Sequence, residues 1–86
     1  MTQVKEQRPI HVIASEIYDD WKNPNFAAVP YLEAMESLTT IDDNYFLDSG
    51  EGIVAYFLSN AGTWRGEVAR RVKKELNAML KARRAW

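Results

Sequence analysis

The chain has 86 residues, no cysteine and a formal net charge of −1. This length predicts one domain, and the lack of cysteine excludes disulfides, thiol catalysis and cysteine-ligated metal sites. No apolar run reaches the ~18–20 residues that a membrane span requires, and the N-terminal residues lack the apolar region of a signal peptide, so we expect a cytoplasmic protein.

The charges are distributed unevenly along the chain. Residues 9–62 contain nine acidic residues and one lysine, whereas residues 63–86 contain eight basic residues and two glutamates. Two explanations are open. The basic segment packs beside the acidic body and is partly neutralised there, or it presents its charge to an acidic partner.

The first part of the chain predicts a tail and two helices. Residues 1–8 are polar and aperiodic, so we expect a disordered tail there, followed by a single helical domain over 9–86. A helical stripe predicts the first helix over 10–22. The second helix begins near residue 28, because Pro30 fits within a first helical turn, and its apolar face extends to Leu38. The stripe of the first helix consists of Ile10, Ile13, Ala14, Ile17 and Trp21.

Residues 53–58 form the densest apolar run, and we interpret them as the helix on which the others pack. Asp48 and Glu51 have the spacing of a capping box, and Gly62 suits the C-terminal end of this helix. A strand is the alternative because the run is rich in β-branched and aromatic residues, but no other segment has the pattern of a partner strand. In the connection before this helix, we expect three residues to anchor the chain to the core: Tyr45, Phe46 and Leu47.

The last helix is predicted over residues 64–83, with Thr63 as its N-cap. Apolar residues occupy less than half of its circumference, and basic residues occupy most of the remainder. The four helices together predict an all-α fold, a compact bundle with short connections.

Few residues offer enzyme chemistry. His11 is the only histidine, and it borders the apolar stripe of the first helix. Ser49 lacks the Gly-x-Ser-x-Gly context of a nucleophile elbow, and residues 50–52 lack the ending of a phosphate-binding loop. We therefore expect no catalytic residues and no cofactor.

The acidic residues before the central helix do not fit a calcium loop. If such a loop began at Asp42, Leu47 would stand where glycine is needed and Ile53 where glutamate is needed. We therefore expect no metal site.

Binding is the remaining class of function, and two surfaces are candidates. One is the basic face of the last helix, and the other consists of the acidic faces of the first two helices with the loop 39–48. The candidate partner-binding residues are Arg65, Arg70, Arg71, Lys73, Lys74, Lys81 and Arg84 on the basic face, and Asp42 and Asp43 in the loop.

These surfaces leave two hypotheses. Protein binding is favoured, because a sequence pI of about 5.8 is unusual for a nucleic-acid-binding protein. Nucleic-acid binding through the basic face is the alternative, although Trp64 and Val68 stand where a helix-turn-helix would place base-reading polar residues. Self-association into a homodimer stays open, since a small helical domain gains core by pairing.

Four segments carry a resemblance to known proteins: residues 21–35, 48–50, 53–61 and 63–66. Their order resembles that in a group of small proteins carried by bacteriophages and other mobile elements of Gram-positive bacteria. The resemblance covers roughly residues 10–80. It implies a phage accessory protein that binds a host or phage machine, such as a modulator or inhibitor of a host defence, transcription or replication protein. It brings no catalytic residues.

Overall fold

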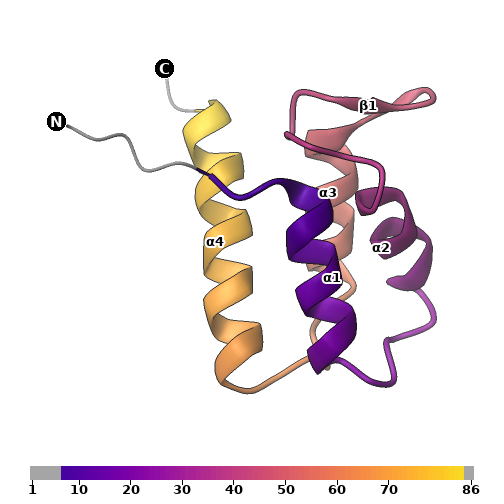
Figure 1. Ribbon diagram of the computed structural model, residues 1–86, viewed down its shortest axis with the longest axis vertical. Helices are drawn as coiled ribbons and strands as arrows, with labels where there is room; N and C mark the ends of the chain where they lie inside the picture. Colours follow the sequence, from indigo (N-terminus) through magenta and orange to yellow (C-terminus); the bar gives the residue numbers. More distant parts are fainter. Residues whose placement is uncertain (1–6, 85–86) are drawn as a thin grey trace, which may run out of the picture.

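The computed structural model describes residues 7–84 and the side chains of residues 7–82, which form four helices and one short hairpin (Figure 1). The compact, mainly helical domain predicted from the sequence is confirmed. The all-α prediction is not fully confirmed, because a two-stranded antiparallel sheet stands between the second and third helices. The elements are α1 (Ile10–Asp20), α2 (Val29–Met35), β1 (Asn44–Tyr45), β2 (Asp48–Ser49), α3 (Gly50–Ser59) and α4 (Glu67–Arg84).

Consecutive helices run in opposite directions, so the chain passes up and down around one core (Figure 1). Both α1 and α3 contact α2 and α4. The amides of Ile10 and His11 donate to the carbonyl oxygens of Thr39 and Leu38, each at 2.9 Å. These bonds satisfy the first amides of α1, which have no partner within the helix, and join its start to the segment that leaves α2. In residues 7–84 no helix is long and apolar enough to cross a bilayer.

The core forms where the apolar stripes of the helices meet, and Phe57 of α3 lies near its aromatic centre. Its ring packs edge-on against Trp21 and Trp64, with centroid separations of 6.3 and 6.4 Å. The two indoles stack at 5.7 Å, and Trp64 Nε1 donates to Asp20 Oδ2 at 2.9 Å. The helix predicted for residues 53–58 is confirmed, with Ile53 buried and no exposed surface on Val54 or Phe57. Its role as the helix on which all others pack holds for α2 and α4 only, and α1 contacts the same two helices.

The start of α3 differs from the prediction by one residue. Ser49, not Asp48, is the N-cap, and its hydroxyl accepts a hydrogen bond from the Gly52 amide at 2.9 Å. Both residues belong to β2, where Asp48 pairs with Tyr45 and Ser49 with Asn44, but only Ser49 directly precedes α3. A strand pairing thus continues directly into the helix and fixes the residue available for capping.

The connection between α3 and α4 also differs from the prediction. The C-cap of α3 is Asn60 rather than Gly62. The last helix begins at Glu67 instead of residue 64, so Thr63 is not its N-cap. Gly66 precedes α4 with a φ of 114°, a backbone conformation that favours glycine. Trp64 lies in this connection and its side chain is buried in the core. The prediction places it at the start of the last helix.

Candidate functional site

Hydrogen bonds to Asp43 fix the base of the hairpin between α2 and α3. The Asp43 carboxylate accepts hydrogen bonds from the amides of Thr39 at 2.8 Å and Thr40 at 3.2 Å. These bonds lower the pKa of Asp43, with Thr39 as the larger cause. The Asp43 carbonyl oxygen accepts from the Gly50 amide at 2.7 Å. One residue therefore closes the turn before β1 and joins it to the start of α3.

The hairpin tip is apolar and faces solvent. The pairs Asn44–Ser49 and Tyr45–Asp48 leave only Phe46 and Leu47 to connect the strands. The Phe46 side chain is 85% exposed, and that of Leu47 is fully exposed. The prediction that Phe46 and Leu47 anchor this connection to the core is wrong. Of the three predicted anchors only Tyr45 packs against the core, because a two-residue turn places the side chains of Phe46 and Leu47 beyond the last pair of the ladder.

The backbone at the tip is strained. Phe46 has a φ of 57°, and a positive φ at the first central residue of a two-residue hairpin favours glycine. An aromatic residue in the left-handed region costs about 1–2 kcal/mol. The Phe46 ring gains one neighbour, the edge of Tyr45 at a centroid separation of 4.8 Å. Neither the strain nor the exposure of the tip is explained by contacts among residues 7–84.

The tip lies within an acidic part of the chain. Residues 23–64 contain six carboxylates and no lysine, arginine or histidine. The two predicted loop residues, Asp42 and Asp43, lie just before β1, and Asp48 directly follows Leu47. Asp42 and Asp48 are exposed, while Asp43 is partly covered by the turn that it closes. The apolar tip therefore has negative charges close to it.

Part of the predicted basic face is engaged within the fold. Arg71 of α4 donates to the Glu16 carboxylate of α1. Lys73 Nζ donates to the Trp64 carbonyl oxygen at 2.6 Å and lies 5.8 Å from the centroid of its ring. Burial lowers the pKa of Lys73, with a smaller contribution from Arg65. The first explanation for the charge asymmetry, packing of the basic helix beside the acidic body, therefore holds for Arg71.

Other predicted basic residues face solvent. Arg70, Lys74 and Lys81 are exposed and lie on one side of α4, because they are separated by four and seven positions. Arg65 is exposed in the connection before α4. Arg84 is the last residue of α4, and its side chain is not among those that the structure describes.

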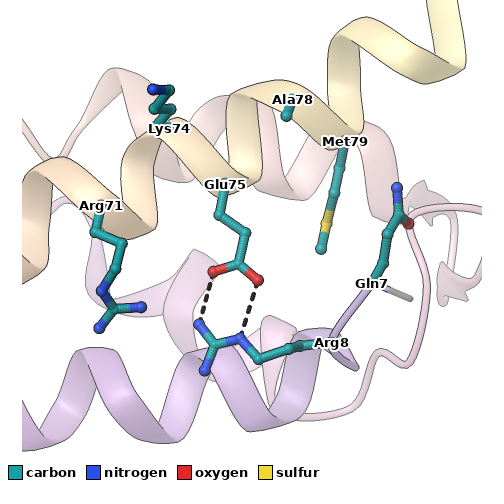
Figure 2. A pocket seen from close by; sticks show the side chains of 7 residues that line it. All are labelled: Gln7, Arg8, Arg71, Lys74, Glu75, Ala78 and Met79. Carbon is teal, nitrogen blue, oxygen red and sulfur yellow. Dashed lines mark hydrogen bonds and ion pairs between the residues drawn. The ribbon is translucent and has the colours of Figure 1, made fainter. Parts of the chain in front are cut away.

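A pocket of about 540 Å³ lies between the segment before α1 and one face of α4 (Figure 2). Arg8 crosses it and binds Glu75 through two hydrogen bonds, from Nε at 2.9 Å and from Nη2 at 2.7 Å. Arg8 Nη2 also lies 2.9 Å from Glu16 Oε1. The prediction of a disordered tail over residues 1–8 is therefore wrong at Arg8, which is bound to the helices. Residues 1–6 lie outside the described part. The pocket lining comprises Gln7, Arg8, Arg71, Lys74, Glu75, Ala78 and Met79.

Four charged groups at or beside this pocket pair with one another, whereas Lys74 in its lining faces solvent. Hydrogen bonding by Arg71, and then by Arg8, lowers the pKa of Glu16. Hydrogen bonding to Glu75 is the main reason that the pKa of Arg8 is raised. Two guanidinium groups and two carboxylates thereby join the start of the described chain to α1 and α4. The arrangement is that of a structural ion-pair network.

The described residues offer no group of three or more histidine, cysteine or carboxylate side chains placed to hold a metal ion. His11 is exposed at the start of α1. Comparison of the chain with protein-family models, curated proteins and solved structures finds no match.

Proposed function

We propose that this protein acts by binding another protein, without catalysing a reaction, and that the hairpin tip is its main contact. The observation that carries the proposal is the exposure of Phe46 and Leu47 on a strained turn. Backbone strain reduces the stability of the free protein, and the exposed apolar side chains add almost nothing to it. A partner that covers the tip would remove this apolar surface from water, which favours binding.

The base of the hairpin supports the proposal, because it orders the tip before any partner arrives. Asp43 closes the preceding turn, and Ser49, the last residue of the hairpin, caps α3. A contact that is already ordered loses less conformational entropy on binding. Large apolar or aromatic side chains that enter a partner's pocket commonly dominate the energy of an interface.

The biological setting that we propose is that of a small accessory protein of a phage or mobile element. It would act in the cytoplasm as a modulator or inhibitor of a host defence, transcription or replication protein. The resemblance of residues 10–80 to such proteins supports this setting. The fold adds a compact helical body that presents one short projecting element (Figure 1).

The test compares the wild type with the double variant Phe46→Gly, Leu47→Asn in pull-downs from a Gram-positive bacterial lysate treated with nuclease. Glycine followed by asparagine suits the same turn and removes both apolar side chains. We expect a protein captured by the wild type to be lost with the double variant. Phe26→Ser is the matched control. Phe26 is likewise exposed, at 91%, but it belongs to the connection between α1 and α2. Capture that is equal for wild type and double variant refutes the proposal.

Nucleic-acid binding is a second candidate, favoured by the exposed row of Arg70, Lys74 and Lys81 on α4. Three basic side chains on one helix face would neutralise phosphates and give salt-dependent retention on DNA. The triple variant with glutamate at these positions tests this candidate without disturbing Lys73, which is engaged with Trp64. Unchanged retention on DNA at low salt rules out this face.

A further inference from the structure

We infer that the partner's docking site is an apolar pocket bordered by lysine and arginine side chains, into which Phe46 and Leu47 insert. This inference rests on the proposed function, because it describes the partner of the same hairpin. It adds the chemistry of the surface that the hairpin recognises.

The apolar part of the inference comes from the geometry of the tip. Phe46 and Leu47 are consecutive, and both project beyond the last strand pair, Tyr45–Asp48. A flat polar surface would leave most of their area in water, whereas a pocket covers both side chains at once. The Tyr45 ring, packed against the core and edge-on to Phe46 at 4.8 Å, limits the directions that the Phe46 ring can take.

The basic border follows from charge complementarity. The charged residues nearest the tip in the chain, Asp42, Asp43 and Asp48, are all acidic, so a partner surface that surrounds the tip meets negative charge. Asp48 follows Leu47 directly and is exposed. The hydrogen bonds from Thr39 and Thr40 keep the Asp43 carboxylate ionised. Like charges around the partner's pocket would oppose docking, while lysine and arginine would speed the encounter and fix its register.

The same charges separate this contact from the basic row on α4. Carboxylates beside the tip repel phosphates, so a nucleic acid is disfavoured at the hairpin. In Figure 1 the hairpin also projects from the α2–α3 side of the bundle, away from α4. The two surfaces therefore suit partners of opposite charge.

Photocrosslinking from the tip tests the inference on the full chain. The photoreactive residue p-benzoylphenylalanine replaces Phe46 in one variant and Phe26 in the control. The connection 21–28, which contains Phe26, lies at the opposite end of the bundle from the hairpin (Figure 1). Both variants are irradiated in a nuclease-treated Gram-positive lysate, and the crosslinked peptides are identified by mass spectrometry. Thermal melting confirms that each variant is folded.

Support for the inference requires three results together. Position 46 gives an adduct to one protein that position 26 does not give. The linked residue lies among apolar side chains with lysine or arginine beside them. The yield falls about tenfold or more when Asp48→Lys is added, or when NaCl is raised from about 50 to about 500 mM, because both changes weaken the attraction between opposite charges. Glu33→Lys, a charge reversal at an exposed position on α2, should reduce the yield less.

Other outcomes overturn the inference in distinguishable ways. The basic border is refuted if the linked site lacks basic residues, or if the crosslinking yield does not change with Asp48→Lys and with salt. Either result leaves the proposed function standing. An adduct to a second copy of this chain refutes the basic partner and shows that the tip mediates self-association. The absence of any adduct specific to position 46 refutes the proposed function as well.

Discussion

Replacing Gly50 with alanine gives a sharp test of how the hairpin joins α3. Alanine normally favours a helix over glycine by about 0.5–1 kcal/mol, so helix propensity alone predicts a more stable protein. A Cβ at position 50, however, would lie 2.8 Å from the Asp43 carbonyl oxygen, 3.0 Å from that of Ile41 and 3.1 Å from that of Thr40. All three contacts are to backbone atoms, which cannot rotate away as a side chain can.

The steric effect should therefore exceed the gain in helix propensity. Overpacking in a closely packed site costs about 1–3 kcal/mol, so we expect Gly50→Ala to reduce the free energy of unfolding by about 1–2 kcal/mol. For a domain of this size such a loss lowers the Tm by about 5–15 °C. The Asp43 carbonyl oxygen cannot move without loss of the 2.7 Å hydrogen bond that it accepts from the Gly50 amide.

Gly62→Ala is the matched control. A Cβ at Gly62 meets no atom within 4 Å, and the backbone there does not require glycine. We expect this substitution to raise the free energy of unfolding by about 0.4–1 kcal/mol, because it restricts the unfolded chain. Thermal melting followed by circular dichroism measures both variants. A Gly50→Ala protein that melts at or above the wild-type Tm refutes the close approach of the three carbonyls.

Three further predictions concern the core, Lys73 and the charged network. Phe57→Ala should cost about 3–5 kcal/mol in urea unfolding, since Phe57 is fully buried; a near-neutral result would contradict its central position. Lys73→Ala should cost about 1 kcal/mol through its lost contacts with Trp64, whereas exposed Lys74→Ala should change stability by less than about 0.5 kcal/mol; equal effects would refute the distinction. Glu16→Gln should cost about 1 kcal/mol or less at neutral pH. Because the pKa of Glu16 is lowered in the fold, this difference should be present above the ordinary glutamate pKa of about 4.3 and disappear as pH falls through the lower folded value. A difference that persists in acid would show that the ion pairs are not its source.

Sequence reasoning locates the helices well because their apolar stripes are long or dense. The stripe in α1 corresponds to a buried helix face, and so do Ile53, Val54 and Phe57 of the run at residues 53–58. The helix ends are less accurate, because local signals compete there. Thr63 is a good N-cap by residue type, but Trp64 is drawn into the core before the helix begins. Gly66, with its positive φ, marks the true start.

The candidate site is harder to predict from the sequence. Phe46 and Leu47 have the composition of a buried anchor, and hydrophobicity alone assigns them to the core. Their exposure depends on the register of β1 and β2, which pairs only two residues on each side. One signal is present in the sequence: the two apolar residues are adjacent and have no periodic partners in a polar segment. The sequence alone also does not show that Lys73 is engaged within the fold while Lys74 is exposed. That difference depends on where the fold places Trp64, whose carbonyl oxygen accepts a hydrogen bond from Lys73.

The hydrogen bonds between Arg8 and Glu75 join residues 67 positions apart, whereas α2, the hairpin and α3 are neighbours in the chain. Contacts between distant residues require closure of a long loop and tend to form late. We expect the Arg8–Glu75 pair to be absent from the folding transition state and complete only in the native protein. Its loss should then accelerate unfolding with little change in the rate of folding. A part-exposed pair of this kind is worth about 1 kcal/mol or less, so on this view it lengthens the lifetime of each folded molecule by about fivefold at most.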